Sequence, residues 1–210
     1  MESLSRDELL SELSNAILYG KSDRALELLD KALAEKISFD TIIAESILKA
    51  HLIFGEWYAR DKIGSLKAWE FCFFTTVKVL KVLDSRIPQP EKPPFSVIVA
   101  TVHSEGHITM RDVIATMLRG KGLKVYGMKK GITANNIDGP LADETLKYVV
   151  LSCSEDATKP ILDELTKAIR ARRPDVKIVA GGAMAPRSGA DMVLNDPLKL
   201  YSLLVDHFNN

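Results

Sequence analysis

The spacing of hydrophobic and polar positions changes near residue 90 of this 210-residue chain. Before that point apolar residues recur every three or four positions, which is typical of amphipathic helices. After it, short apolar runs alternate with helical stretches, as in a parallel sheet covered by helices on both faces. Residues 85–94 contain four prolines and separate the two patterns. We therefore predict a helical domain over residues 1–87, a proline-rich linker over 88–94 and an α/β domain over 95–210.

The first part predicts a bundle of four helices joined by short connections. Ser5 and Glu8 are expected to form a capping box at the start of the first helix, and Ser22 is expected to cap the second. The third helix begins at Ser38 or Asp40. Its expected apolar face consists of Ile42, Ile43, Ile47, Leu48 and Leu52.

Aromatic residues are concentrated in the fourth predicted helix, which opens at Gly64 and Ser65. We expect this cluster to lie first of all in the bundle core. Because the aromatic positions are partly consecutive, some of them must face away from that core. The cluster comprises Trp69, Phe71, Phe73 and Phe74.

The second part predicts five strands and three helices. The expected strands cover residues 95–100, 123–128, 148–152, 176–180 and 191–194, and the expected helices cover 108–119, 159–172 and 197–208. Strands that alternate with helices form a parallel sheet. We expect the loops after the first, third and fourth strands to meet at one edge of that sheet.

Composition narrows the classes of function. The chain has 28 basic and 28 acidic residues, a balance that argues against a general nucleic-acid binder. Its densest basic stretch, Arg170 to Arg173, ends a predicted helix, where cations complement the helix dipole. No stretch predicts a signal peptide or a membrane span. Cys72 and Cys153 lie in separate apolar segments, so we expect two thiols and a cytoplasmic location.

Candidate chemistry lies in the loops after three predicted strands. His103, Ser104 and Gly106 follow the first strand. Imidazole is the commonest protein ligand for transition metals, and glycines let a ligand approach the backbone. No phosphate-binding loop, dinucleotide fingerprint, zinc spacing or Ser-His-Asp triad is apparent, so the edge is suited to holding a large ligand with one axial metal contact. The other residues in these loops are Ser152, Ser154, Gly181 and Gly182.

These motifs resemble those of the corrinoid (cobalamin-binding) proteins of methyltransferase systems, and the resemblance extends over the whole chain. That family carries D-x-H-x-x-G after the first strand, S-x-L after a later strand and a G-G pair after the next. This chain has the segment from Thr101 to Gly106 at the first position. It has Ser152-Cys153-Ser154 at the second and Gly181-Gly182 at the third.

The resemblance implies a helical cap like that of methionine synthase, followed by a flavodoxin-like (Rossmann-like) domain that binds cobalamin. His103 would be the lower axial ligand of cobalt, and Thr101, Ser104 and Gly106 would lie beside the cofactor. Ser152, Ser154 and the glycine pair would line the cleft for its nucleotide tail. The cobalt would cycle between Co(I) and methyl-Co(III). The protein would be a methyl carrier without catalytic residues of its own, loaded and unloaded by partner methyltransferases.

The sequence departs from the family pattern at two positions and leaves several alternatives open. Thr101 stands where the family has the aspartate that orients the ligating imidazole, and Ser154 stands where it has leucine. His107 is a rival ligand, although its register does not match the motif. A cobalamin sensor or storage module and a cofactor-free interaction domain are the alternative functions. The methyl donor and the oligomeric state, including a homodimer, stay undecided.

Overall fold

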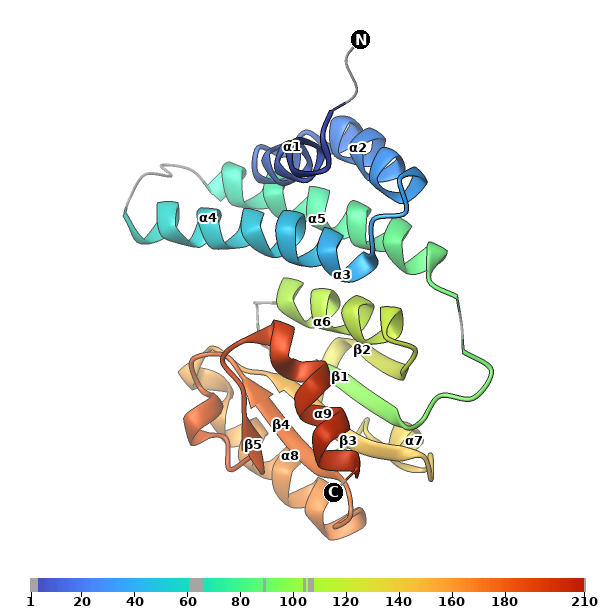
Figure 1. The fold of residues 1–210 in the computed structure, drawn as a ribbon. Helices are drawn as coiled ribbons and strands as arrows, with labels where there is room; N and C mark the ends of the chain where they lie inside the picture. The colour runs from blue at the N-terminus through green and yellow to red at the C-terminus, as the bar shows by residue number, and fades with distance from the viewer. Residues whose placement is uncertain (1–3, 61–65, 89, 104, 106–107, 210) are drawn as a thin grey trace. The chain divides into compact units, whose positions relative to one another are not determined.

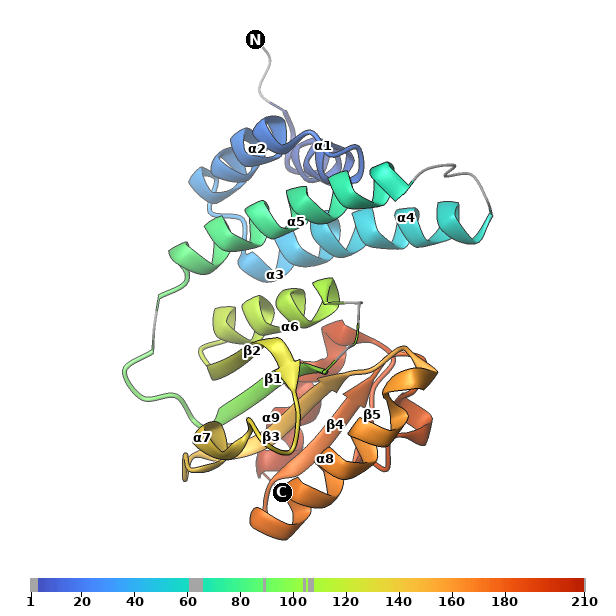
Figure 2. The same ribbon diagram turned by 180° about the vertical axis from the view of Figure 1, so that it is seen from behind.

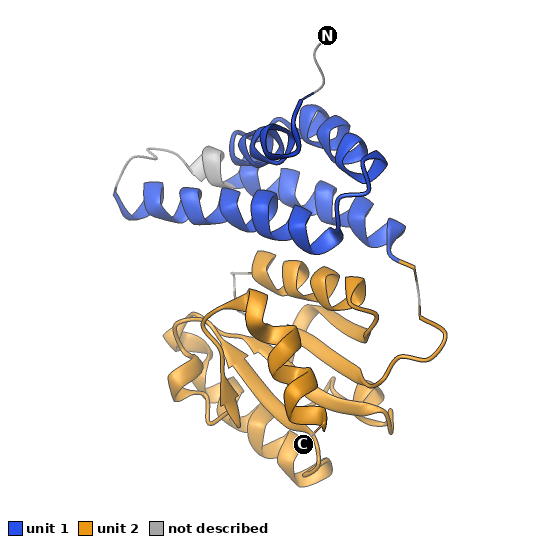
Figure 3. Cartoon of the chain, viewed as in Figure 1, with its two compact units in different colours: residues 1–87 blue, residues 88–210 orange. Residues whose placement is uncertain are grey.

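The computed structural model describes residues 4–60, 66–88, 90–103, 105 and 108–209, with the backbone alone for residues 66–69. The chain divides into two compact units, residues 1–87 and residues 88–210 (Figure 3). The regular elements described in the first unit are all helical, and the second is an α/β unit (Figure 1). No helix in the described part of the chain is long and apolar enough to cross a membrane.

Helices of the first unit begin close to the predicted positions. They are α1 (Arg6–Leu18), α2 (Ser22–Ala34), α3 (Phe39–Ile42), a π-helical segment (Ile43–Leu48), α4 (Lys49–Ala59) and α5 (Leu66–Arg86). Because α3, the π-helical segment and α4 are continuous, the described residues of this unit form four long helices, the number that the sequence predicts.

Two of the three expected helix caps are present. Ser5 and Glu8 form the capping box of α1, and the Thr41 N–H donates to Ser38 Oγ at 3.2 Å. The cap expected from Ser22 is wrong, because α2 begins at Ser22 itself. Its hydroxyl lies 2.8 Å from Thr75 Oγ1 and joins α2 to α5 instead.

The apolar face predicted for the third helix is interrupted at its end. Ile42, Ile43 and Ile47 are fully buried, but Leu52 is 70% exposed. The π-helical segment explains the difference, since a wider turn rotates every later side chain relative to the pattern expected for an α-helix. The prediction for Leu52 is therefore wrong.

Two of the aromatic side chains predicted for the fourth helix face away from the bundle core. Phe71 and Phe74 are each more than half exposed, while Phe73 is half-buried. The bundle core is instead filled by aliphatic side chains such as Leu13, Ile17 and Leu28. The expectation that some of these aromatic side chains face away from the core is confirmed by Phe71 and Phe74.

The second unit contains a five-stranded, entirely parallel sheet with strand order β2-β1-β3-β4-β5, the order of flavodoxin-like folds. This confirms the predicted fold class. The strands are β1 (Ser96–Val102), β2 (Lys124–Ile132), β3 (Leu146–Ser152), β4 (Lys177–Gly181) and β5 (Met192–Val193). The helices are α6 (Thr109–Gly120), α7 (Asp138–Leu141), α8 (Lys159–Arg172) and α9 (Leu200–Asn209).

Helices cover both faces of this sheet. Figures 1 and 2 show α9 on one face and α8 on the other. The α8 face is a continuous apolar core in which Leu162 and Leu165 meet strand residues such as Leu151 and Ile178. Because β1, β3 and β4 are neighbours, the loops that follow them share one end of the sheet, as the sequence predicts.

Candidate functional site

Small and polar residues form a row across the carboxyl ends of three strands. Thr101 of β1 pairs with Ser152 of β3, which pairs with Gly181 of β4. Residues in register on parallel strands point to the same face of a sheet. The next row on this face, two residues further into the sheet, consists of Val99, Val150 and Val179. The end of the sheet is therefore polar and open, and its interior is apolar.

A cavity of about 300 Å³ opens at this end, between the sheet and helices α6 and α9. The sequence-predicted residues Ser152, Ser154, Gly181 and Gly182 all line it. Thr101 is fully buried in the same row, one strand away. The remaining lining residues are Met110, Ile114, Val150, Leu151, Val179, Leu194, Asn195, Pro197 and Leu200.

Three polar side chains in the lining have no protein partner among the residues that the structure describes. Neither the hydroxyls of Ser152 and Ser154 nor the side-chain amide of Asn195 forms a hydrogen bond with any residue that the structure describes. Neither serine caps the helix that follows, because α8 begins after Thr158 and the short helix before it begins after Glu155. Polar groups that line a cavity without a protein partner are available to a ligand.

The glycine at position 182 is required by the backbone. Gly182 has φ +98°, and a Cβ atom there would collide with the carbonyl oxygen of Cys153. The Met184 N–H donates to that same carbonyl at 3.1 Å, so the loops after β3 and β4 are held together. Burial raises the pKa of the Cys153 thiol to about 11, with the nearby charge of Glu105 adding to the effect. Cys153 is therefore a protonated core thiol and not a nucleophile.

Glu105 is the residue of this region that the sequence analysis missed. Its side chain is buried, and Oε2 accepts hydrogen bonds from the backbone N–H groups of Ser154 at 2.7 Å and Glu155 at 3.1 Å. The carboxylate thus joins the loop after β1 to the loop after β3. The sequence contains one indication of its role, which is its distance from a histidine. Glu105 lies two positions before His107, just as the aspartate lies two positions before the histidine in D-x-H.

His103 lies immediately after β1, and its side chain is exposed. Its backbone N–H donates to Ile132 O at 3.1 Å, and its ring Nδ1 lies 3.5 Å from Lys130 O. Gly131 packs against the His103 backbone, with the position of a Cβ only 2.9 Å from His103 Cα. No hydrogen bond joins His103 to Thr101 in the described part of the chain.

Two residues of the predicted motif, Ser104 and Gly106, lie outside the described residues. The rival ligand His107 lies outside them as well. The described part of the site therefore consists of the row of Thr101, Ser152 and Gly181, the cavity beside it and the Glu105 carboxylate.

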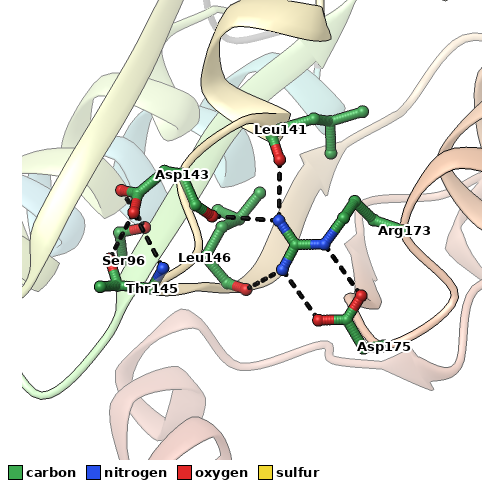
Figure 4. A network of polar contacts seen from close by, with 7 residues as sticks. All are labelled: Ser96, Leu141, Asp143, Thr145, Leu146, Arg173 and Asp175. Carbon is green, nitrogen blue, oxygen red and sulfur yellow. Dashed lines mark hydrogen bonds and ion pairs between the residues drawn. The ribbon is translucent and has the colours of Figure 1, made fainter.

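The opposite end of the sheet carries polar groups that are paired with each other (Figure 4). The Arg173 guanidinium donates to the carbonyl oxygens of Leu141, Asp143 and Leu146 and forms a two-point ion pair with Asp175. Arg173 lowers the pKa of Asp175 to about 2. The basic stretch at the end of α8 therefore has a structural role, as predicted, although Arg173 binds carbonyls of other segments rather than those of its own helix.

Asp143 anchors the starts of three strands at this end. Its carboxylate accepts hydrogen bonds from the Ser96 hydroxyl at 2.8 Å, the Tyr126 hydroxyl at 2.8 Å and the Thr145 N–H at 2.9 Å. Burial by itself raises the pKa of Asp143, but the hydrogen bonds from Thr145, Ser96 and Tyr126 outweigh it and hold the pKa well below its ordinary value.

Comparison with known proteins adds a second line of evidence. The chain is 25% identical over 193 residues to dimethylamine corrinoid protein 2 of Methanosarcina acetivorans, covering 90% of this chain and 88% of that protein. It is 27% identical over 194 residues to dimethylamine corrinoid protein 1 of Methanosarcina mazei, covering 90% of this chain and 88% of that protein. This chain is similar to corrinoid proteins of methyltransferase systems. The resemblance inferred from the sequence is thereby confirmed, although no model of a known protein family matches the chain.

Solved structures support the fold. The monomethylamine corrinoid protein of Methanosarcina barkeri matches with a TM-score of 0.79 at 19% identity, covering 97% of this chain and 100% of that chain. The methanol:cobalamin methyltransferase complex of the same organism matches with a TM-score of 0.50 at 13% identity, covering 98% of this chain and 86% of that chain. At these identities the matches establish the fold alone.

Proposed function

We propose that this protein is a corrinoid-binding methyl carrier that serves separate methyltransferases and has no catalytic residues of its own. The observation that carries the proposal is the cavity at the carboxyl ends of β3 and β4, with its glycine pair and three unpartnered polar side chains. The similarity to dimethylamine corrinoid proteins over 90% of the chain agrees with it.

The residues at this end of the sheet fit the nucleotide tail of a corrinoid. The absence of a side chain at Gly181 and Gly182 leaves backbone accessible, and the free hydroxyls of Ser152 and Ser154 supply hydrogen bonds. A bound corrinoid supplies a cobalt ion that accepts and releases a methyl group. The protein's own contribution is to hold the tail, to present one imidazole and to keep water from the buried part of the cavity.

The lower cobalt ligand is proposed to come from the loop after β1. His103 is the histidine that the motif order assigns. Its Nδ1 lies 3.5 Å from the Lys130 carbonyl oxygen, and a carbonyl in such a position orients a ligating imidazole. Thr101 then replaces the motif aspartate. A second alignment of D-x-H-x-x-G begins four residues later. In it Glu105 replaces the aspartate, His107 is the cobalt ligand and Met110 replaces the glycine. The buried Glu105 carboxylate favours this second assignment.

The partners follow from the same proposal. The relatives are named for dimethylamine, so a methylamine is the first donor to test, delivered by a partner methyltransferase. The helical unit, residues 1–87, is the proposed cap over the upper face of the corrin, with residues 88–94 as linker. Two buried free cysteines, Cys72 and Cys153, agree with a cytoplasmic location. A sensor or storage module uses the same cofactor and differs in having no methyltransferase partner.

Reconstitution tests cofactor binding. The purified full chain is mixed with hydroxocobalamin, reduced to the Co(II) state and passed through a gel-filtration column. We expect a coloured complex with one cobalt per chain. A colourless protein peak contradicts the proposal and leaves the interaction-domain alternative. Adding a methylamine-specific methyltransferase to the complex then separates a carrier, which becomes methylated, from a storage protein, which does not.

Labelling tests the lower ligand. The complex is prepared in the Co(II) state from protein labelled with ¹⁵N-histidine, and its electron paramagnetic resonance spectrum is recorded. A protein imidazole on cobalt changes the nitrogen splitting from a triplet to a doublet on labelling, whereas the cofactor's own base leaves it unchanged. The variants His103→Ala and His107→Ala then identify the ligand, since only one of them removes the labelled splitting.

A further inference from the structure

We infer that the cavity selects the lower base of the corrinoid, and that it accepts an apolar benzimidazole base and disfavours a purine base. The inference rests on the proposed function, because it concerns which tail enters the proposed cleft. It is carried by the distribution of polar and apolar groups between the mouth of the cavity and its inner end.

All polar side chains of the lining lie at the mouth. Ser152 is the last residue of β3, Ser154 follows it, and Asn195 lies two residues after β5. These groups are available to the ribose and phosphate of a nucleotide tail, which are the polar parts that connect the base to the corrin ring. The mouth therefore has hydrogen-bonding capacity where a tail needs it.

The inner end of the cavity is aliphatic. Val150 and Val179 precede Ser152 and Gly181 by two residues, which is about 7 Å further into the sheet. Ile114 of α6 and Leu200 of α9 also line the cavity. The backbone groups of β3 and β4 are paired with each other along this stretch. Among the described residues that line the inner end, no side chain donates or accepts a hydrogen bond.

This arrangement distinguishes two classes of base. Dimethylbenzimidazole carries two methyl groups on its distal ring, and burying them among valine, isoleucine and leucine is favourable. Adenine carries an amine and ring nitrogens at the same distal positions. These groups would lose their water without gaining a partner, which weakens binding by about 10- to 100-fold.

The test compares two cofactors that differ only in the base. Cobalamin and its adenine-containing analogue are titrated against the full chain, and each Kd is obtained from the change in the visible spectrum. We expect cobalamin to bind about 10-fold more tightly or better. Equal dissociation constants overturn the inference and leave the proposed function standing. Failure of both cofactors to bind overturns the proposed function itself.

Matched variants assign the selectivity to the cavity. Val179→Thr places a hydroxyl at the inner end with little change of volume, and we expect the preference for cobalamin to fall at least about 5-fold. Val99→Thr is the control, because Val99 lies in the same buried row but outside the cavity lining. We expect it to leave the preference unchanged. If Val179→Thr does not fold, Val150→Thr replaces it. An equal response of the lining and control variants overturns the assignment to this cavity.

Discussion

The polar side chains at the two ends of the parallel sheet differ in whether they have protein partners. At the amino ends of the strands, the Arg173 guanidinium and the Asp143 carboxylate are each bonded to four other residues through short hydrogen bonds and ion pairs. At the carboxyl ends, the side chains of Ser152, Ser154 and Asn195 border a cavity without a partner among the described residues.

This difference separates stability from binding. A polar group with protein partners stabilises the fold, and its removal leaves those partners unsatisfied. A polar group that faces a cavity contributes little to the folded state and is available to a ligand. Changes at the amino end should therefore lower stability without affecting cofactor affinity, and changes of side chains at the carboxyl end should do the reverse.

The largest expected effect at the amino end comes from Arg173→Met. The change leaves the Asp175 carboxylate and three carbonyl groups without their donor, and we expect a loss of about 3 kcal/mol in the free energy of unfolding. Corrinoid affinity should stay within about twofold, which is near the precision expected for an unperturbed site. Denaturant unfolding and a binding titration measure the two quantities.

The control for that change is Arg187→Met. Arg187 pairs with Asp156 at 3.4 Å, but both side chains are largely exposed, so the expected loss is below about 0.5 kcal/mol. If Arg187→Met lowers the free energy of unfolding as much as Arg173→Met does, the contacts of Arg173 have no special role in stability.

At the carboxyl end, Gly182→Ala should affect stability and binding together. The Cβ collides with the Cys153 carbonyl in a backbone conformation that favours glycine, and the expected cost is about 2 kcal/mol, with corrinoid affinity reduced at least about 10-fold. Gly189→Ala is the matched control, because Gly189 also has positive φ but has open space around it. It should cost about 1 kcal/mol and leave affinity unchanged. Equal effects of the two changes argue against a close approach at Gly182.

The pH dependence of stability tests Asp143. Its pKa is lowered in the folded protein, so its contribution to stability is present above the unfolded value of about 3.9 and is lost as the pH falls further toward the folded value. Asp143→Asn should therefore be less stable than the wild type at pH 7 by about 2 kcal/mol. The difference should shrink steadily below about pH 4. A difference that is independent of pH contradicts this account.

The smallest expected effects come from one serine at each end. Ser96→Ala removes the hydroxyl that donates to Asp143 and should cost about 1 kcal/mol of stability with no change in affinity. Ser152→Ala removes an unpartnered hydroxyl, so stability should change by less than about 0.5 kcal/mol while affinity falls about 5-fold. A loss of affinity for Ser96→Ala together with a loss of stability for Ser152→Ala would contradict the division between a stabilising end and a binding end.

The sequence predicted the parts of the fold that depend on regular spacing. Helix α8 runs from Lys159 to Arg172 as predicted, and the five strands appear in a parallel sheet because their apolar runs and the helices between them leave few other arrangements. The sequence also predicted that Ser152 and the glycine pair lie at strand ends on one edge of the sheet, and all three line the cavity there.

The parts that the sequence did not predict depend on local geometry or on partners distant in the chain. Leu52 is exposed because a π-helical segment changes the rotation of α4, and no residue type marks such a segment. Glu105 was missed because its partners are backbone groups 49 and 50 positions away. Asn195 was not predicted because it reaches the cavity only through the pairing of β5 with β4, which brings the loop after β5 to this end of the sheet.

Hydrogen–deuterium exchange on the full chain, with and without hydroxocobalamin, tests the division between the two ends most directly. We predict that the cofactor protects residues 150–154, 179–183 and 194–200 and leaves exchange at residues 141–147 and 173–177 unchanged. Protection that is absent from the first set, or equal in both sets, contradicts the claim that the carboxyl ends of the strands hold the corrinoid.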